Sequence, residues 1–394
     1  MKICFLVSNI FTLGGVQRVV SSLATELSKS CKVDIVCTED NVIVDKQIYN
    51  LSNDVNIVIR EDLLDSKYRN SLYSKVLRRI NRKVKFLDKN IFNDLLVSAY
   101  YPKSERKAFI NYINSNNYDI VIGVEGKYSI LLGLISSSIN SKTIGWQHNS
   151  YEAYFSKYRQ YLWHKESLFK KYVPLLGAYI VLTNYDKNKI LSEKSVHTQV
   201  IYNPLSFTSE LKSECKNKQI LFVGRLVEEQ KGLDLLIEAF KQISYYEPEW
   251  RLCIVGDGED REKLINLIKA NKLEENIELH QFTNDVKSFY RNSSIFISTS
   301  RWEGFGLVIT EAMECGLPVV AFRNSGPQEI INKNNVNGIL VENGNVNELV
   351  KSVLNLIRDE KVLIEMSKES IKRAKDFSIE ETAKEWLNLF NKLV

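Results

Sequence analysis

The densest group of turn and charged residues in this sequence combines glycines with two carboxylates. The apolar run 294–300 leads into Glu303-Gly-Phe-Gly306, where a helix is expected to begin, and Glu311 follows in that helix. Free N–H groups at such a helix start bind anions, and the glycines let phosphate or sugar oxygens come close. The two carboxylates can accept hydrogen bonds from vicinal hydroxyls of a sugar or a ribose. Taken alone, the same pattern also describes a strand-to-helix turn with solvent-exposed acids.

Two cations follow another expected strand. Arg225 and Lys231 come soon after the apolar run 219–223. Open α/β sheets bind ligands at the carboxyl ends of their parallel strands, and an Arg fork beside a Lys charge suits a diphosphate. Exposed loop cations are also common without any ligand, so this cluster does not define a site by itself.

Other strand ends carry weaker signals. Gly14 and Gly15, with Gln17 after them, repeat the phosphate-turn pattern, but they are not a GxGxxG motif, so NAD or FAD binding is not expected. His148 closes the apolar run 142–147 and is one of four histidines; a lone His is more often structural, but the end of a strand favours a site. No spacing of His, Asp or Glu indicates a metal centre. The scattered cysteines, without a CxxC pair, are typical of reduced core residues in a cytosolic protein.

Short apolar strands alternate with amphipathic helices along the whole chain. The strands expected in the first half are 2–9, 32–39, 56–60, 119–125, 142–147 and 178–184, and those in the second half are 218–226, 251–258, 276–282, 294–300 and 317–322. Helices are expected at 16–29, 233–243, 259–270, 285–292, 307–315 and 346–357. This alternation predicts parallel sheets covered by helices on both faces. The fold class is therefore α/β, with two Rossmann-like, doubly wound parallel-sheet domains.

A polar segment rich in Lys, Glu and Ser follows Tyr202-Asn203-Pro204 and marks the expected domain boundary. We expect an N-terminal domain over 1–203 and a C-terminal domain over 204–376. The remaining segment, 377–394, is expected to hold a helix with an apolar stripe that includes Trp386.

The net charge of +5 conceals an uneven division. Residues 1–205 carry 28 Lys and Arg against 18 Asp and Glu, a balance of +10, whereas residues 206–394 carry 25 against 30, a balance of −5. A basic half joined to an acidic half suggests that one half meets a polyanion, either nucleic acid or an anionic membrane. No apolar run approaches ~18 residues, so no segment is expected to span a membrane.

The segment 68–89 is the most basic part of the first half. Apolar residues recur in it at helical spacing, and the cations among them include Arg78, Arg79, Arg82 and Lys83. A basic amphipathic helix of this kind is typical of an interfacial membrane segment or a nucleic-acid arm, but it also describes a solvated helix packed on its own domain. The segment does not match a nucleic-acid recognition module, so no nucleic-acid partner is expected.

Taken together, these motifs resemble the retaining glycosyltransferases of family 4, of the bacterial surface-polysaccharide type, which have the GT-B fold. The resemblance covers nearly the whole chain, most closely 218–345, and departs from the family at Gln17, where many relatives have Glu. The matching motifs are Gly14-Gly15-Val-Gln-Arg, Trp146-Gln-His-Asn, Tyr202-Asn203-Pro204, Gly224-Arg225 with Lys231-Gly232, Val255-Gly256-Asp257-Gly258, and Glu303-Gly-Phe-Gly followed by Glu311.

The resemblance implies that the two domains face a cleft and that a sugar moves from a nucleotide sugar to an acceptor bound by the N-terminal domain, with retention at the anomeric carbon. The catalytic set would be Arg225, Lys231, Glu303 and His148, with the two cations on the donor diphosphate and His148 beside the donor sugar. The donor-binding set would be Gly14, Gly15, Gly304, Phe305, Gly306, Leu307 and Glu311, with Glu311 on the ribose. The final helix would pack back on the N-terminal domain.

Neither a cofactor nor a metal is expected. As the anomeric C–O bond breaks, Arg225, Lys231 and the helix start near Gly306 can stabilise the negative charge that grows on the diphosphate. In a front-face transfer the leaving phosphate takes the proton of the acceptor, so no dedicated base is required, and the sequence offers none.

The family's commonest usage suggests a uridine-linked donor carrying a hexose or an N-acetylhexosamine, and a lipid-linked or glycan acceptor. The protein is expected in the cytoplasm, peripheral on the inner face of the plasma membrane, with Arg78, Arg79, Arg82 and Lys83 on the anionic lipid. Two alternatives stay open: another GT-B enzyme that uses a nucleotide sugar, such as an epimerase or a phosphorylase, and a non-catalytic nucleotide-sugar-binding subunit.

Overall fold

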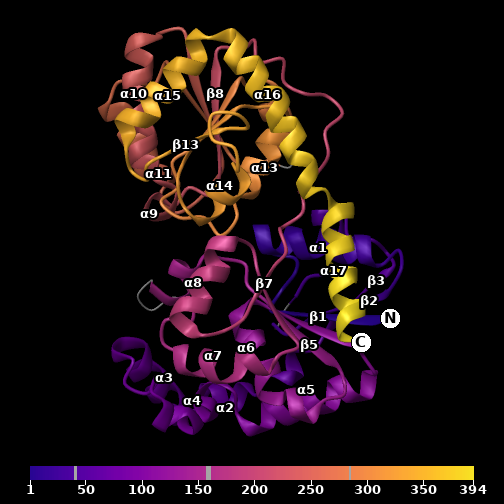
Figure 1. The fold of residues 1–394 in the computed structure, drawn as a ribbon. Helices are drawn as coiled ribbons and strands as arrows, with labels where there is room; N and C mark the ends of the chain where they lie inside the picture. Colours follow the sequence, from indigo (N-terminus) through magenta and orange to yellow (C-terminus); the bar gives the residue numbers. More distant parts are fainter. Residues whose placement is uncertain (40–41, 157–160, 284) are drawn as a thin grey trace. The chain divides into compact units, whose positions relative to one another are not determined.

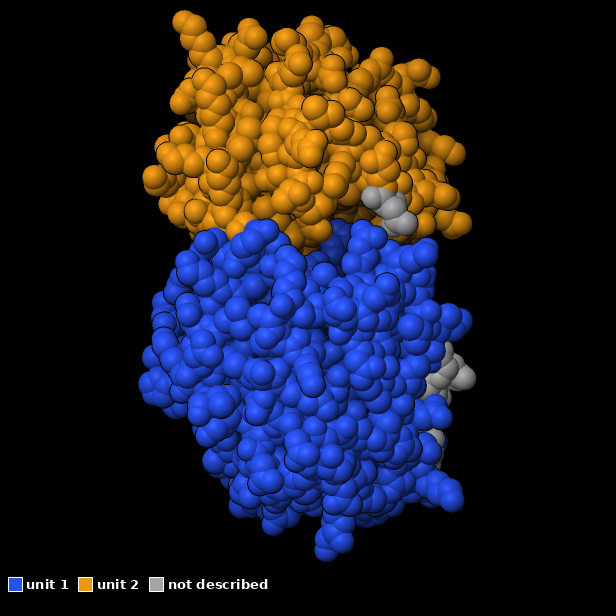
Figure 2. Space-filling view, turned by 90° about the vertical axis from the view of Figure 1, so that its right-hand side faces the viewer, with its two compact units in different colours: residues 1–204, 379–394 blue, residues 205–378 orange. Residues whose placement is uncertain are grey.

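The strands of the computed structural model, which describes residues 1–39, 42–156, 161–283 and 285–394, lie in two separate sheets (Figure 1). One unit consists of Met1–Pro204 and Ile379–Val394, and the other of Leu205–Ser378. Figure 2 colours these as unit 1 and unit 2, the names used below. The chain thus leaves unit 1 after residue 204 and rejoins it at residue 379.

The sheet of unit 1 has seven parallel strands in the order β3-β2-β1-β4-β5-β6-β7. Phe5 of β1 lies opposite Ile35 of β2 on one side and Ile122 of β4 on the other, so the strand order reverses beside β1. The strands are β1 Lys2–Val7, β2 Lys32–Cys37, β3 Val55–Ile59, β4 Ile120–Val124, β5 Lys142–Trp146, β6 Ala178–Val181 and β7 Gln199–Val200.

The helices of unit 1 cover this sheet because its central strands are apolar throughout. β1 and β4 are almost wholly buried, as expected for parallel strands covered on both faces. The helices are α1 Gly15–Leu27, α2 Ser66–Asn70, α3 Leu72–Val84, α4 Asn93–Tyr100, α5 Lys103–Asn116, α6 Glu125–Ile135, α7 Glu166–Tyr172, α8 Asn184–Lys194 and α17 Ile379–Leu393. Shorter helical turns are η1 Lys46–Tyr49, η2 Glu61–Leu63, η3 Asn90–Phe92, η4 Ser136–Ser138, η5 Glu152–Ser156 and η6 Val173–Leu175.

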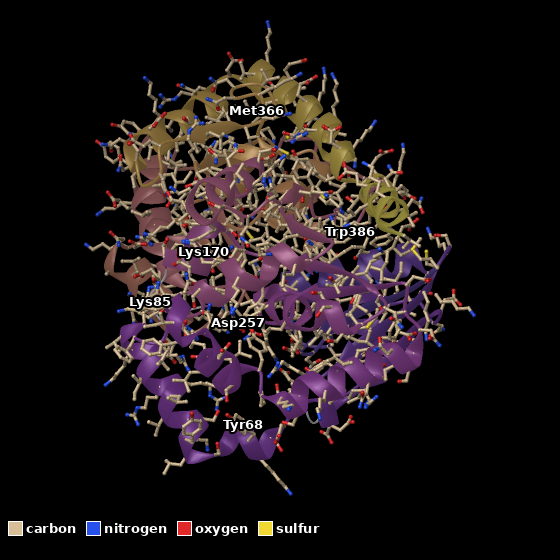
Figure 3. The ribbon with its side chains drawn as sticks, turned by 60° about the horizontal axis from the view of Figure 1, so that its bottom comes forward. Tyr68, Lys85, Lys170, Asp257, Met366 and Trp386 are labelled. Carbon is tan, nitrogen blue, oxygen red and sulfur yellow. The ribbon has the colours of Figure 1, made fainter. Side chains whose placement is uncertain are left out.

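Helix α17 completes unit 1 from the far end of the sequence. It packs on α1, and its Trp386 (labelled in Figure 3) is fully buried. The ring of Trp386 meets the ring of Trp146, at the end of β5, edge to face with 4.8 Å between the centroids. Such aromatic pairs contribute about 0.5–1.5 kcal/mol beyond their buried area.

The sheet of unit 2 has six parallel strands in the order β10-β9-β8-β11-β12-β13. In Figure 1, α10 and α11 lie on one side of it and α13 and α16 on the other. The strands are β8 Gln219–Val223, β9 Arg251–Val255, β10 Ile277–His280, β11 Ile295–Ser298, β12 Val319–Phe322 and β13 Ile339–Val341. The helices are α9 Glu228–Lys231, α10 Leu233–Tyr246, α11 Arg261–Ala270, α12 Val286–Arg291, α13 Leu307–Glu314, α14 Ser325–Ile330, α15 Val346–Arg358 and α16 Glu360–Ala374, followed by the turn η7 Lys375–Phe377.

The predicted fold class, two doubly wound parallel α/β domains, is confirmed by these sheets.

The prediction of one continuous helix over 68–89 is wrong. Ser71 interrupts it and caps α3, because its Oγ accepts a hydrogen bond from the N–H of Ser74. The helix ends at Val84, because Lys85 adopts a left-handed conformation with φ +53°. Figure 3 labels Tyr68 and Lys85 in this segment.

Within the described residues, no helix combines the length and the apolar character that crossing a bilayer requires.

Candidate active site

Lys231 and Glu303, which were predicted from separate clusters, form an ion pair at the edge of the unit 2 sheet. β8 and β11 are parallel neighbours, so their carboxyl ends meet at one edge. Lys231 ends α9, which follows β8, and Glu303 lies in the loop after β11. The Lys231 ammonium donates to Glu303 Oε1, and the two side chains are only 12% and 10% exposed. Low exposure strengthens the interaction between the charges.

Hydrogen bonds to three parts of Glu303 fix its position. Ser300 Oγ donates to Glu303 Oε1 at 2.7 Å. The N–H of Glu303 donates to Asn324 Oδ1 at 2.9 Å, and its carbonyl accepts from Ser325 Oγ at 2.8 Å. The hydroxyl of Thr299 also donates to the carbonyl of Lys231, at 2.9 Å. The pair is therefore held by the neighbouring loops before any ligand contact is considered.

The start of α13 lies directly after this loop. Gly306 occupies the N-cap position with φ +103°, a conformation that favours glycine, and no described side chain caps the helix. The amides at the start, from Leu307 onward, can therefore bind an anion. Phe305 is held against Gly326, where an added Cβ would lie 2.1 Å from the Phe305 carbonyl oxygen. The turn Gly304 to Gly306 is buried as a whole.

Arg225 has a different environment from Lys231. It is exposed, and its guanidinium makes no hydrogen bond or ion pair with the residues that the structure describes. Its loop is positioned by the motif 255–258. A Cβ on Gly256 would lie 1.9 Å from the carbonyl oxygen of Gly224, and the N–H of Leu226 donates to the carbonyl of Asp257 at 2.9 Å. The motif 255–258, which is one of those that resemble the family, thus has a packing role beside Arg225.

Glu311, the second carboxylate of the spacing motif, lies inside unit 2. It is 1% exposed, and Tyr290 donates its hydroxyl to Glu311 Oε2 at 2.9 Å. Glu303, taken as a whole residue, is 7% exposed. The alternative interpretation of this motif as a turn with solvent-exposed acids is therefore wrong, because the turn places both carboxylates below the surface.

Gly14 and Gly15 lie in unit 1, at the exposed start of α1. The N–H of Gly14 donates to the hydroxyl of Tyr49 at 2.8 Å. Gln17 closes the loop before the helix, because its amide nitrogen donates to the carbonyl of Asn9 at 3.4 Å and to Thr12 Oγ1 at 3.0 Å. A Glu at this position could not donate these bonds, which gives the departure from the family a structural consequence.

His148 follows β5, and its ring packs on Trp146 with 4.2 Å between the centroids. Both ring nitrogens are buried and have no hydrogen-bond partner among the described residues. Burial lowers the pKa of the His148 imidazole to about 3. The ring is therefore neutral at physiological pH and cannot serve as a cationic acid.

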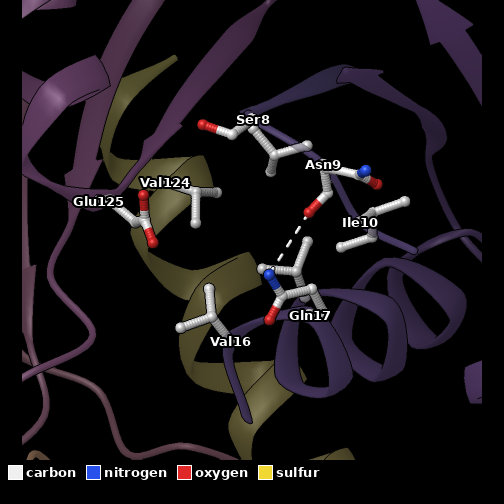
Figure 4. A pocket seen from close by; sticks show the side chains of 9 residues that line it. Ser8, Asn9, Ile10, Val16, Gln17, Val124 and Glu125 are labelled. Atoms are coloured by element: carbon white, nitrogen blue, oxygen red, sulfur yellow. Dashed lines mark hydrogen bonds between the residues drawn. The ribbon is translucent and has the colours of Figure 1, made fainter. Parts of the chain in front are cut away.

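A pocket opens in unit 1 between the carboxyl ends of β1 and β4 (Figure 4). Its polar lining comes from Ser8, Asn9, Gln17 and Glu125. Sequence reasoning missed Glu125, because it assigned this residue to the apolar strand 119–125. The available signal was a carboxylate at the end of a buried strand, with a glycine directly after it.

Three of the four predicted membrane-contact residues, Arg79, Arg82 and Lys83, are exposed on α3, and Arg78 is half-buried. Four apolar residues of the helix also face outward. Leu72 is 79% exposed and Val84 is 64% exposed, while Val76 and Ile80 between them are 45% and 44% exposed. These four residues are called the apolar stripe below.

Two polar residues share the inner face of α3 with Leu77, which packs against the core of unit 1. Ser74 and Asn81 are fully buried. Asn81 Nδ2 donates to the carbonyl of His164 at 2.6 Å, and Ser74 Oγ donates to the carbonyl of Ala99 at 3.3 Å. The helix therefore buries two polar residues and leaves the apolar stripe exposed, whereas an ordinary surface helix turns its apolar face inward.

Three potential metal ligands meet in unit 2, although no metal site was predicted. The ligand atoms of Cys253, Glu278 and His280 lie within 4.8 Å of one another, on the neighbouring strands β9 and β10. Burial raises the pKa of the Cys253 thiol to about 12, which disfavours the thiolate that binds metal. None of the residues predicted for the site belongs to this group.

Known proteins that are similar to this chain are glycosyltransferases. Residues 207–377 match the family model described as "Glycosyl transferases group 1". The chain is 30% identical to an uncharacterized glycosyltransferase of Haemophilus influenzae, over 98% of each chain. It is also 30% identical to the amylovoran biosynthesis glycosyltransferase AmsD of Erwinia amylovora, over 76% of this chain and 86% of that one.

Among solved structures, the chain is similar to S. aureus TarM in complex with fondaparinux, alpha-GlcNAc-glycerol and UDP. The TM-score is 0.75 at 17% identity, over 99% of this chain and 100% of that one. At this level of identity the likeness concerns the fold.

Proposed function

Because the chain belongs to the glycosyltransferases, we propose that it transfers a sugar, with retention, from a uridine-linked nucleotide sugar to a lipid-linked or glycan acceptor in cell-surface polysaccharide assembly. The observation that carries this proposal is the Lys231–Glu303 pair beside the uncapped start of α13. The UDP in the TarM complex supports the choice of base, and the amylovoran relative supports the choice of pathway.

The donor diphosphate binds at the carboxyl edge of the unit 2 sheet. Arg225 is exposed and free to reach a phosphate, while Lys231 presents a fixed charge and the first amides of α13 add donors. Negative charge on the diphosphate grows as the anomeric C–O bond breaks. These groups therefore bind the transition state more tightly than the bound donor, which is the condition for raising turnover.

The two buried acids of unit 2 hold hydroxyl groups of the donor. Glu303 Oε1 already accepts from Lys231 and Ser300, which leaves Oε2 for a hydroxyl of the transferred sugar. Glu311, at 1% exposure, takes the ribose hydroxyls at a position set by Tyr290. The neutral His148 ring adds a hydrogen bond to the donor sugar from unit 1. Gly14 and Gly15 contribute backbone amides to the phosphate.

The transfer needs no general base from the protein. The acceptor oxygen bonds to the anomeric carbon on the face that the phosphate leaves, and the acceptor proton passes to the departing phosphate oxygen. Configuration at the anomeric carbon is therefore retained. We propose that this chemistry runs without a divalent ion, since Arg225, Lys231 and the helix start supply the positive charge.

A donor panel tests the proposal. The purified chain is incubated in excess EDTA with UDP-glucose, UDP-galactose, UDP-N-acetylglucosamine or UDP-N-acetylgalactosamine, with and without an added glycan. The release of UDP is measured as the sugar is transferred to the glycan or to water. We expect one donor to be cleaved, with the α-anomer as the first product by NMR. Arg225→Ala and Lys231→Ala should each lose about 10²–10³ in kcat. Lys263→Ala, which removes the ion pair of the exposed Lys263 with Glu228, is the control and should keep its activity.

Other results would contradict the proposal in distinct ways. UDP binding without turnover favours the non-catalytic subunit, and an epimerised free sugar or a sugar phosphate as the product favours the epimerase or the phosphorylase. Activity that appears only after Mg²⁺ or Mn²⁺ is added back would show that metal independence is wrong.

The acceptor side of the proposal places unit 1 on the inner face of the plasma membrane through α3. Arg79, Arg82 and Lys83 are exposed next to the apolar stripe. Each Lys or Arg near an anionic leaflet contributes about 1 kcal/mol of binding. The apolar stripe adds insertion at the level of the headgroups. This arrangement suits an acceptor that is itself held in the membrane.

A further inference from the structure

The pocket beside Glu125 lies where the strand order of unit 1 reverses. β1 has β2 on one side and β4 on the other, and the pocket is lined by the ends of β1 and β4 and by α1. Open α/β sheets bind ligands in the crevice at such a reversal.

Glu125 has an unusual backbone conformation. It is the first residue of α6 and directly follows the last residue of β4, so the chain passes from strand to helix without a connecting residue. Its φ is +72°, in the left-handed region that disfavours a long side chain. A sharp strand-to-helix turn of this kind projects its side chain from the carboxyl edge of a sheet. The fold therefore maintains a strained residue where a ligand would bind.

The carboxyl group of Glu125 has no hydrogen-bond or ion-pair partner among the residues that the structure describes. Figure 4 shows it across the pocket from Gln17. Burial is the main cause that raises its pKa; Lys127 opposes this shift, and Glu39 adds to it. A partly buried carboxyl group without a partner is costly, and a ligand hydroxyl would relieve that cost.

The other polar groups of the pocket complete the description of its ligand. Asn9 Oδ1 accepts from the N–H of Phe11 at 2.8 Å, and no described residue accepts from the Asn9 side-chain amide. The Ser8 hydroxyl contacts the Tyr128 hydroxyl at 3.2 Å. Neutral donors and acceptors around one carboxyl group suit a polyol, whereas the negative charge of Glu125 disfavours a phosphate.

We propose that this pocket binds the acceptor sugar, and that the Glu125 carboxylate accepts a hydrogen bond from an acceptor hydroxyl. The inference rests on the proposed function and assigns it a site on unit 1. It makes Glu125 a binding and positioning residue on the acceptor side, distinct from the donor groups Arg225, Lys231 and Glu303.

The test measures binding of methyl α- and β-glycosides of glucose, galactose, N-acetylglucosamine and N-acetylgalactosamine to the full chain by saturation-transfer NMR. Glu125→Asn keeps a residue that tolerates positive φ and removes the charge, and Glu125→Gly removes the side chain and the strain together. We expect at least one glycoside to bind, and both variants to weaken it by about ten-fold or more, as for a lost hydrogen bond to a charged group. Their melting temperatures should not fall.

The matched control is Ser195→Gly. Ser195 also has a positive φ, +58°, but lies outside the pocket, so this change relieves the same kind of backbone strain and should leave glycoside binding unchanged. Donor hydrolysis by water is measured in parallel. It should stay within about two-fold in both Glu125 variants, because the donor groups are untouched. Absence of glycoside binding to the unmodified chain, equal binding by the variants, or a fall in donor hydrolysis would overturn the acceptor site. Failure of the unmodified chain to cleave any donor would instead contradict the proposed function.

Discussion

Lys231 and Glu303 are 72 residues apart in the sequence, yet they form an ion pair with each other. Within the described chain, neither residue forms an ion pair with any other side chain. The two side chains are 12% and 10% exposed, so removal of either one leaves an unpaired charge with little access to water. The pair thus links the folding of the α9 region to that of the loop before α13.

This relationship gives a prediction about stability. In a double-mutant cycle of Lys231→Ala and Glu303→Ala, the coupling energy should be about 1–3 kcal/mol, measured by urea unfolding. The pair of Lys263 with Glu228, whose side chains are 61% and 21% exposed, is the control and should give less than about 1 kcal/mol. Equal coupling in the two cycles would contradict the picture of a shielded pair.

A second prediction concerns pH. Burial lowers the pKa of His148 to about 3, below the ordinary value of 6.5, so between these pH values the unfolded chain binds more protons at this residue than the folded chain. Its contribution to stability is therefore complete above pH 6.5 and is lost progressively as the pH falls toward 3. His148→Phe, which keeps a ring beside Trp146, should make the free energy of unfolding less dependent on pH in this window. A parallel dependence in the variant and the unmodified chain would contradict the burial of the imidazole.

A third prediction concerns Gln17. Gln17→Glu removes the amide protons that bind the Asn9 carbonyl and Thr12 Oγ1, so it should cost about 0.5–1.5 kcal/mol of stability and speed hydrogen exchange in the loop before α1. Gln17→Met, which lacks both the charge and the donor, separates the two effects. Unchanged exchange in the Glu variant would show that these hydrogen bonds do not hold the loop.

The close approach of Gly256 to Gly224 supplies a fourth prediction. Gly256→Ala places a Cβ 1.9 Å from a backbone oxygen, so the Arg225 loop must move. We expect a loss of about 1–3 kcal/mol together with reduced UDP release. Gly344→Ala adds a Cβ at another positive φ, where nothing lies within 4 Å, and should cost less and spare activity. Equal effects of the two variants would assign the loss to backbone conformation instead of packing.

The fifth prediction concerns α3. The chain should sediment with vesicles that contain anionic lipid, and binding should weaken as salt rises. Changing Arg79, Arg82 and Lys83 to Glu should abolish binding at low salt. Val76→Ser with Ile80→Ser should reduce the part of the binding that high salt does not remove, because these side chains are 45% and 44% exposed. Indifference of the unmodified chain to anionic vesicles at low salt would make a soluble acceptor the better choice.

Much of the fold could be predicted because buried parallel strands are continuous apolar runs, and each predicted strand has a counterpart in the two sheets. The pairing of Lys231 with Glu303 could not be predicted, because it depends on β11 lying next to β8, whereas β9 follows β8 in the chain. Glu125 was missed because it was assigned to the apolar strand 119–125, and its positive φ cannot be read from the residue type, since a Glu rarely adopts this conformation. Helical periodicity predicted an apolar stripe on α3, but it could not predict which face of this helix packs against the rest of unit 1.

The return of α17 to unit 1 has a consequence for the order in which the chain becomes complete during synthesis. Ribosomes make residues 205–378 before residues 379–394, so unit 2 is available in full while unit 1 still lacks a helix. Until α17 emerges, Trp146 has no Trp386 to pack against, and the end of β5 that carries His148 stays open on that side. The N-terminal sheet, although translated first, is therefore the later of the two to reach its finished core.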